Sequence, residues 1–139
     1  MRFMIIVKAT KESEAGVMPE EKLIAAMGAY HEELGKVGVL LDATGLHPTS
    51  KGFRVKYTGP KRTVVDGPFT ETKELIAGYT LIKVKSKQEA IEWAKRYPNP
   101  RGEGMDSEIE VRQLFELEDF TPSEAIDRMR ELDMSIKSK

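Results

Sequence analysis

The run VVDGPFTETKELIAG, residues 64–78, decides how this chain is expected to fold. It begins with the β-branched pair Val64 and Val65 and then turns at Asp66-Gly67-Pro68. Glycine permits backbone conformations that other residues rarely adopt, and proline fixes the direction in which the chain leaves the turn. At Gly78 the chain enters an apolar strand. Two strands are therefore predicted to bring a small set of polar side chains to one corner of the molecule.

Short apolar or alternating runs predict the other strands. Residues 3–7 form a continuous apolar run bounded by charges, which is typical of a strand buried on both faces. Residues 53–57 alternate apolar with basic side chains and lead into a Gly-Pro turn, so a hairpin is expected over residues 53–65. Further strands are predicted to begin at Val39 and to cover residues 79–84 and 109–115.

Three helices are predicted from their apolar spacing and their start signals. The first, from about Glu20 to Lys36, places Leu23, Met27, Tyr30, Leu34 and Val37 on one face. The capping box Ser86–Glu89 begins a second helix that ends near Arg96. A second capping box at residues 121–124 begins a C-terminal helix that reaches about residue 133. Residues 10–16 are expected to form a loop.

This order of elements predicts an α+β fold with one domain, residues 1–139, whose core covers about residues 2–118. Without the hairpin insertion and the extra C-terminal helix, the pattern is the split βαβ arrangement of a ferredoxin-like domain. Two helices can cover one face of such a sheet, yet the strands at residues 3–7 and 79–84 are apolar on both faces. We therefore expect a homodimer in which the sheets of two copies pack together.

Composition narrows the classes of function. The chain of 139 residues is 40% hydrophobic and 32% charged, as expected of a folded globular protein, and its net charge of −1 argues against nucleic acid as a partner. Cysteine is absent, which excludes thiolate chemistry and is expected of a cytoplasmic protein. No apolar run approaches the roughly 20 residues of a membrane span, so no membrane partner is expected. The two histidines are not paired at metal-ligand spacing, and no phosphate-binding glycine loop is present, so we expect neither metal nor cofactor.

The candidate site residues are polar groups that the predicted fold places near the corner. His31 lies at the edge of the apolar stripe of the first helix, and histidine is the residue type most often used for proton transfer, so it is the candidate acid or base. Asp66 and Asp42 are both candidate partners for it, although Asp66 also fits ordinary Asp-Gly turn chemistry. Tyr79 and Arg112 are candidate ligand-binding residues, with core packing and an edge charge as their respective alternatives.

Four motifs together resemble the YciI-like (YCII-related) family, in its DGPF-domain branch. They are Ser50-Lys51-Gly52, the run at residues 64–74, the run at residues 85–94, and Ile109-Glu110-Val111-Arg112. The resemblance covers about residues 2–118 and implies a dimeric α/β barrel. In the wider group a helix histidine and an aspartate are thought to meet in a cavity.

The resemblance carries over to the histidine but not to the aspartate. His31 matches the helix histidine, whereas the family's Asp-Pro stretch after the second helix reads Tyr97-Pro98-Asn99-Pro100 here. Asp66 is the replacement candidate by analogy.

Two functions follow as hypotheses. The first is a small homodimeric enzyme in which His31 and Asp66 move a proton on a small metabolite, in a lyase, isomerase or dehalogenation-type step. The alternative is a non-catalytic small-ligand-binding or regulatory dimer, in which the Asp66 corner stabilises the turn.

Overall fold

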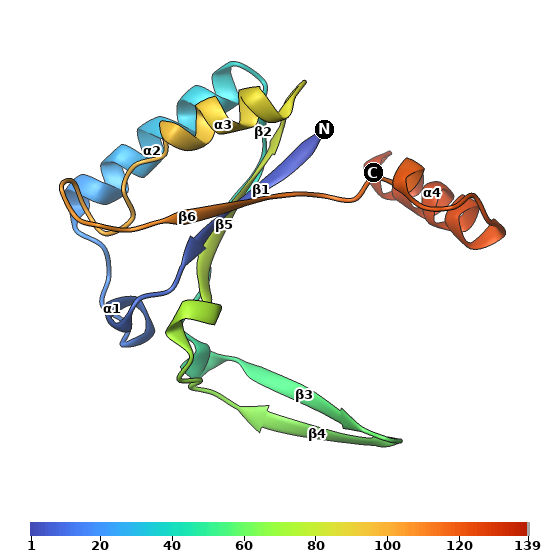
Figure 1. Ribbon diagram of the computed structural model, residues 1–139, viewed down its shortest axis with the longest axis horizontal. Coiled ribbons are helices and arrows are strands. Elements are labelled where there is room, and N and C mark those ends of the chain that lie inside the picture. The colour runs from blue at the N-terminus through green and yellow to red at the C-terminus, as the bar shows by residue number, and fades with distance from the viewer. Residues whose placement is uncertain (139) are drawn as a thin grey trace.

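A four-stranded antiparallel sheet forms the centre of the computed structural model, which describes residues 1–138 (Figure 1). Its strands are, in spatial order, β2 (Leu40–Gly45), β5 (Ile76–Lys83), β1 (Arg2–Lys8) and β6 (Ile109–Gln113). Leaving the hairpin aside, this is the strand order of a split βαβ domain, with the first and third strands of the sheet at its centre. The predicted ferredoxin-like α+β fold is therefore confirmed.

Two helices cover one face of this sheet. They are α2 (Glu21–Lys36) and α3 (Lys87–Lys95), which lie side by side in Figure 1. Alternate residues of the central strands point toward them and are fully buried, including Ile5 of β1 and Ile82 of β5. Leu34 of α2 packs into the same core, and Tyr30 donates a hydrogen bond from its hydroxyl to the carbonyl of Trp93 at 2.7 Å. The apolar spacing read from the sequence thus marks the buried face of α2 at Tyr30 and Leu34, whereas Val37 follows the helix and is exposed.

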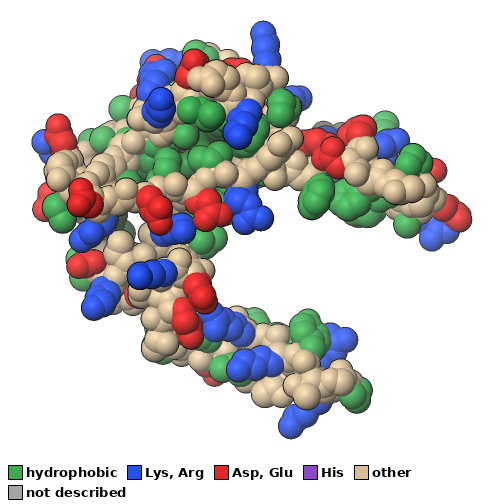
Figure 2. Space-filling model, viewed as in Figure 1, with side chains coloured by type: hydrophobic (Ala, Val, Ile, Leu, Met, Phe, Trp, Pro, Cys, Tyr) green, Lys and Arg blue, Asp and Glu red, His purple; other side chains and the backbone are tan. Residues whose placement is uncertain are grey.

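Two parts of the chain extend away from the sheet (Figure 1). One is the hairpin of β3 (Phe53–Thr58) and β4 (Lys61–Asp66), which ends one residue later than predicted. The other is the C-terminal helix α4 (Glu124–Lys137). Figure 2 shows hydrophobic side chains on both extensions, although neither packs on the four-stranded sheet.

Thr49 connects the hairpin to the body of the molecule. Its hydroxyl donates a hydrogen bond to the Glu14 carboxylate and accepts one from the backbone N–H of Phe69 at 2.9 Å. Its own N–H donates to the other Glu14 carboxylate oxygen at 3.0 Å. Thr49 begins a short 3-10 helix (Thr49–Lys51), and two further 3-10 turns lie at Thr72–Glu74 and Leu117–Asp119. The motif region is therefore a structural junction.

Gly67 lies against this junction without room for a side chain. A Cβ atom at Gly67 would lie 1.9 Å from the backbone carbonyl oxygen of Thr49. The N–H of Gly67 also donates a hydrogen bond to the carbonyl of Gly52 at 3.0 Å. Glycine is needed here for close approach of two backbones, since its φ is not in the left-handed region.

Several predicted boundaries were wrong for local reasons. The expected loop at residues 10–16 contains the short helix α1 (Lys11–Glu14), because Thr10 and Ser13 cap each other's backbone N–H groups. Helix α4 begins at Glu124 with Ser123 as its N-cap, two residues after the predicted start. The second helix is capped by Ser86 as predicted, but the Glu89 carboxylate accepts from the N–H of Lys85 instead of completing the box.

Strand ends also differ slightly from those predicted. Strand β5 begins at Ile76, three residues early, because its first residues pair with the ends of β1 and β2. Strand β6 ends at Gln113, two residues before the predicted end. Among residues 1–138, no helix combines the length and the apolar character needed to cross a bilayer.

Candidate functional site

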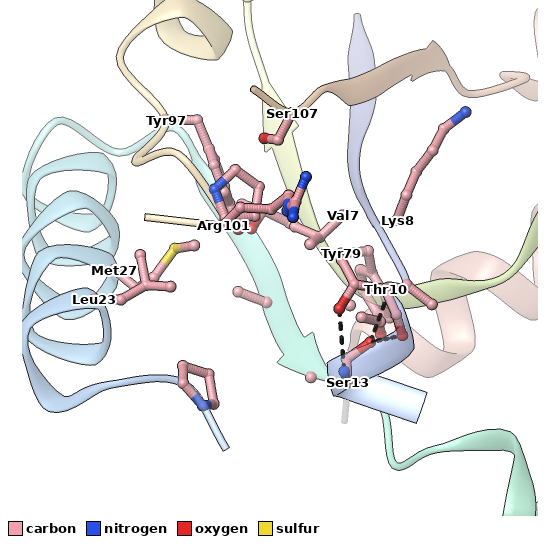
Figure 3. A pocket seen from close by; sticks show the side chains of 18 of the residues that line it. Val7, Lys8, Thr10, Ser13, Leu23, Met27, Tyr79, Tyr97, Arg101 and Ser107 are labelled. Atoms are coloured by element: carbon pink, nitrogen blue, oxygen red, sulfur yellow. Dashed lines mark hydrogen bonds between the residues drawn. The ribbon is translucent and has the colours of Figure 1, made fainter. Parts of the chain in front are cut away.

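A cavity of about 1360 Å³ lies between α2 and the helix-facing side of the sheet. Leu23, Ile24 and Met27 of α2 supply apolar walls, and Val7 of β1 contributes from the sheet (Figure 3). Consecutive residues 40–45 of β2 also line it, so the cavity reaches the edge of the sheet. Its volume exceeds the roughly 300–1,000 Å³ of typical small-molecule sites, which leaves room for a metabolite together with water.

His31 is held in the wall of this cavity by both ring nitrogens. Its Nδ1 lies 2.7 Å from the carbonyl oxygen of Met27, one helical turn earlier. Because a carbonyl can only accept, Nδ1 carries the hydrogen and donates it. Nε2 lies 2.8 Å from the hydroxyl of Thr80 and in the neutral ring accepts its proton. The protein thus selects one tautomer of His31, with the basic nitrogen directed at Thr80.

Thr80 is the single polar residue in the buried core of the described chain, with 1% of its surface exposed. It lies in the centre of β5, opposite Ile5 of β1, on the face covered by the helices. Burial raises the pKa of the neighbouring Tyr97 phenol, and the Thr80 hydroxyl partly offsets that increase. The rings of His31 and Tyr97 are 6.2 Å apart and meet edge to face. His31, Thr80 and Tyr97 form the polar centre of a mostly apolar cavity.

The structure does not pair His31 with Asp66. The Asp66 side chain is exposed at the end of β4, and Asp66 is not among the residues that line the cavity. Asp42 does not pair with His31 either, because its two carboxylate oxygens accept from the N–H of Ala43 at 2.9 Å and from the hydroxyl of Tyr79 at 3.1 Å. The ring of His31 is instead hydrogen-bonded to the backbone carbonyl of Met27 and the hydroxyl of Thr80.

Tyr79 and Arg112 belong to the other face of the sheet. Tyr79 precedes Thr80 on β5, so its side chain leaves the strand on the side opposite the helices, although the residue also borders the cavity near β2. Arg112 of β6 lies opposite Met4 and is exposed, with its guanidinium 3.4 Å from the Glu110 carboxylate. The five candidate site residues are therefore divided between two faces and a hairpin.

Three residues of the site were missed in the sequence. Thr80 interrupts the inward-facing series of β5, which otherwise holds Gly78 and Ile82, and this break in an apolar alternation was a usable signal. Tyr97 follows α3 four residues after Trp93, a spacing that indicates a core residue rather than a site residue. Arg101 lies in the loop after α3, and no periodicity marks it.

Asn99 lies in the Tyr97-Pro98-Asn99-Pro100 stretch after α3, and it organises the loop there. Its amide nitrogen donates to the carbonyl of Met105 at 2.6 Å. Its oxygen accepts from the N–H of Arg101 at 3.0 Å and from the Ser107 hydroxyl at 2.9 Å. All three hydrogen bonds lie within the loop, so Asn99 stabilises the conformation of the loop.

Within the described part of the chain, the site lacks a set of side chains that could together bind a metal ion. Residues 1–138 contain no group of three or more His, Asp or Glu side chains close enough to share one. Both nitrogens of His31 already have protein partners. That no cofactor takes part stays a prediction.

Alkaline titration gives a test of the packing around the cavity. Burial raises the pKa of Tyr30 to about 12, so the folded protein favours the neutral phenol. This contribution to stability is complete below pH ~10, the ordinary value, and we expect it to be lost as the pH rises from there through the folded pKa. Tyr30→Phe should be less stable at neutral pH, because it loses the bond to Trp93, yet should lose less additional stability at alkaline pH.

The measurement is urea unfolding of both proteins over a pH series. Tyr97 titrates in the same direction, so part of the alkaline loss should persist in the variant. Parallel losses in the two proteins would show that Tyr30 is not buried as described.

Comparisons with known proteins relate this chain to one protein family. The family model of the YCII-related domain matches residues 1–117. An uncharacterised protein of Rhizobium meliloti (strain 1021) is 29% identical over 106 residues, which are 76% of this chain and 81% of that protein. Among solved structures, 5-chloro-2-hydroxyhydroquinone dehydrochlorinase (TftG) from Burkholderia phenoliruptrix AC1100, in complex with 2,5-dihydroxybenzoquinone, matches with a TM-score of 0.47 and 16% identity. That match covers 83% of this chain and 94% of the other.

Proposed function

Because this chain belongs to the YCII-related family, we propose that it is a small-molecule enzyme whose proton transfer is centred on His31. The observation that carries the proposal is a large apolar cavity with a histidine of fixed tautomer in its wall. An apolar, aromatic-sized metabolite with one polar group suits such a lining. As part of this proposal the chain belongs to the DGPF branch, which the Asp66-Gly67-Pro68-Phe69 corner supports.

The arrangement supplies a base and a route for its proton. When the Thr80 hydroxyl turns aside, Nε2 of His31 is free to take a proton from a carbon or hydroxyl of the substrate. The Met27 carbonyl then accepts from Nδ1–H of the imidazolium and stabilises its charge. Returning the proton to another atom completes an isomerisation, and giving it to a leaving group completes an elimination or dehalogenation. Asp66 has no part in this scheme, because its carboxylate lies outside the cavity.

The non-catalytic alternative is favoured by one specific observation. Both nitrogens of His31 are already hydrogen-bonded within the protein, as in a structural histidine. In that case the cavity would bind a small molecule without transforming it.

Proton exchange separates the two functions. A panel of small phenols, ketones and halogenated aromatic acids is incubated with the protein in deuterated water, and binding and deuterium incorporation are followed by NMR. An enzyme should exchange substrate protons, and His31→Gln should slow that exchange by about 100-fold or more. Compounds that bind without exchange, with no effect of His31→Gln on the spectra, would establish the binding module instead.

We also propose that two copies pair sheet to sheet. The face of the sheet away from the helices carries Met4, Ile6 and Leu81, which stay half-buried in a single chain. The extensions carry large exposed hydrophobic residues in a further two groups: Phe53, Tyr57 and Val64 on the hairpin, and Leu132, Met134 and Ile136 on α4. Exposed apolar area of this extent supports association with a second copy.

Sedimentation equilibrium tests the pairing. Leu81→Glu puts a charge in the centre of the open face, so we expect it to be monomeric where the wild type is a dimer. Met18→Glu is the matched control, because Met18 is 77% exposed on a loop outside the sheet, and it should remain dimeric. A wild type that stays monomeric at all concentrations would contradict the proposal.

A further inference from the structure

Arg101 brings a positive charge to the cavity. It belongs to the loop between α3 and β6 and is one of the residues that line the cavity. Figure 3 shows its side chain beside Tyr97, with Met27 and Leu23 on the α2 side of the same view. The cavity therefore has an apolar wall on α2 and a cation on the loop.

The Arg101 guanidinium is not neutralised by a close carboxylate. Within residues 1–138, no carboxylate oxygen of an Asp or Glu side chain lies within 4.0 Å of it. Its one hydrogen bond in that range goes from Nη1 to the backbone carbonyl of Asp106, at 3.1 Å. The remaining guanidinium donors are available to a ligand, and a planar guanidinium binds a carboxylate through two parallel hydrogen bonds.

The other charged residues that line the cavity are less suited to bind a carboxylate. Lys8 is engaged by Glu108 and Glu110 at 3.6 and 3.4 Å, and Asp42 accepts from Tyr79. Lys73 is exposed on the 3-10 turn Thr72–Glu74, inside the motif of residues 64–74. Asp106 and Glu108, both on the loop before β6, are acidic and would repel an anion unless Arg101 outweighs them.

Glu12 is the acidic group that faces Arg101 from another element. The two residues line a smaller hollow beside α1. The pKa of Glu12 is lowered mainly by hydrogen bonds from its own backbone N–H and from Thr10, with a smaller contribution from the Arg101 charge. Glu12 therefore needs a control of its own in any test of Arg101.

The loop holds Arg101 in position before a ligand arrives. The N–H of Arg101 donates to Asn99, which also accepts from Ser107 and donates to the carbonyl of Met105. A loop that is already ordered loses less entropy when it binds.

We propose that Arg101 binds the carboxylate of the cavity's ligand, and that the substrates are small, largely apolar carboxylic acids. Their apolar part would lie against Leu23 and Met27, with the reacting atom near His31. This inference rests on the proposed function and specifies its substrate class.

Two probes that differ in charge test the proposal. Calorimetric titration of the full chain compares 4-hydroxybenzoate with 4-hydroxybenzyl alcohol, which is similar in size and neutral. We expect the acid to bind about tenfold tighter or better, since charged hydrogen bonds contribute more than neutral ones. Arg101→Gln should bring the acid down to the affinity of the alcohol, Arg101→Lys should restore part of the preference, and Glu12→Gln should leave it intact or increase it.

The outcomes distinguish failure of the Arg101 proposal from failure of the proposed small-molecule function. Equal binding of acid and alcohol by the wild type, or equal losses for both in Arg101→Gln, would overturn the role of Arg101 and leave the cavity as a neutral-ligand site. Loss of the preference in Glu12→Gln would show that the Glu12–Arg101 pair is structural and would also overturn it. Binding of neither probe would contradict both the carboxylate proposal and the small-molecule function.

Discussion

Gly67→Ala is expected to lower the free energy of unfolding by about 3 kcal/mol or more. The added Cβ would lie 1.9 Å from the carbonyl oxygen of Thr49, a distance at which one backbone segment must move. Thr49 cannot move freely, because its hydroxyl and N–H are bonded to Glu14 and its hydroxyl also accepts from Phe69. The substitution should therefore loosen the connection between the hairpin and the body.

Gly28→Ala is the matched control for this prediction. Gly28 lies within α2, and apart from its chain neighbours and the backbone of its own helix no atom comes within 4 Å of the position of its Cβ. An alanine there should stabilise the protein by up to about 1 kcal/mol, because glycine is a poor helix former. Chemical unfolding of both variants gives the comparison. Gly67→Ala with the stability of the wild type would show that the close contact with Thr49 is absent.

Thr80→Val is expected to destabilise the protein by about 1–3 kcal/mol, although valine has the same shape and is more apolar. Thr80 is 1% exposed, and its hydroxyl is the partner of His31 Nε2. Removing the hydroxyl leaves this nitrogen acceptor without its protein donor in a mostly apolar wall, and that lost hydrogen bond outweighs the gain from burying a methyl group. The ring would also lose the contact that fixes its basic nitrogen.

Three further variants make this prediction specific. Thr80→Ser retains the hydroxyl and should recover most of the lost stability, whereas Thr80→Ala should not. In a double-mutant cycle, Thr80→Val should have a smaller effect when His31 is already alanine, because the two side chains interact directly. Additive effects of the two substitutions would mean that the bond between His31 and Thr80 contributes nothing to stability.

Most of the sheet and its helices could be predicted because periodicity reports burial. Tyr30 and Leu34 recur at helical spacing and are buried against the sheet. The hairpin follows from the alternation of residues 53–57 before a Gly-Pro turn and the β-branched residues 63–65 after it. The short helix α1 could not, because it depends on reciprocal caps between Thr10 and Ser13 rather than on an apolar face. Local hydrogen bonds of this kind leave little trace in a hydrophobic pattern.

The site was harder to predict than the fold, for a different physical reason. His31 was found because its residue type is rare and its place on the helix is defined by the helix itself. Its partner depends on which strand residue lies across the layer, and that contact with Thr80 joins segments far apart in the sequence. Asp66 stands out in the motif, yet the residue of the motif that the packing constrains most tightly is its neighbour Gly67.

The chemical shifts of the two histidines report whether His31 has a single tautomer in the wall of a binding cavity. His31 lies in the cavity wall, whereas His47 is exposed on a loop outside the lining and serves as an internal reference. In nitrogen-correlated NMR spectra, neutral His31 should show the tautomer with hydrogen on Nδ1, and 4-hydroxybenzoate should shift its signals while leaving those of His47 in place. A His31 that exchanges between tautomers and responds to the probe no more than His47 would contradict the account, because the cavity would then be neither ordered around this residue nor a binding site.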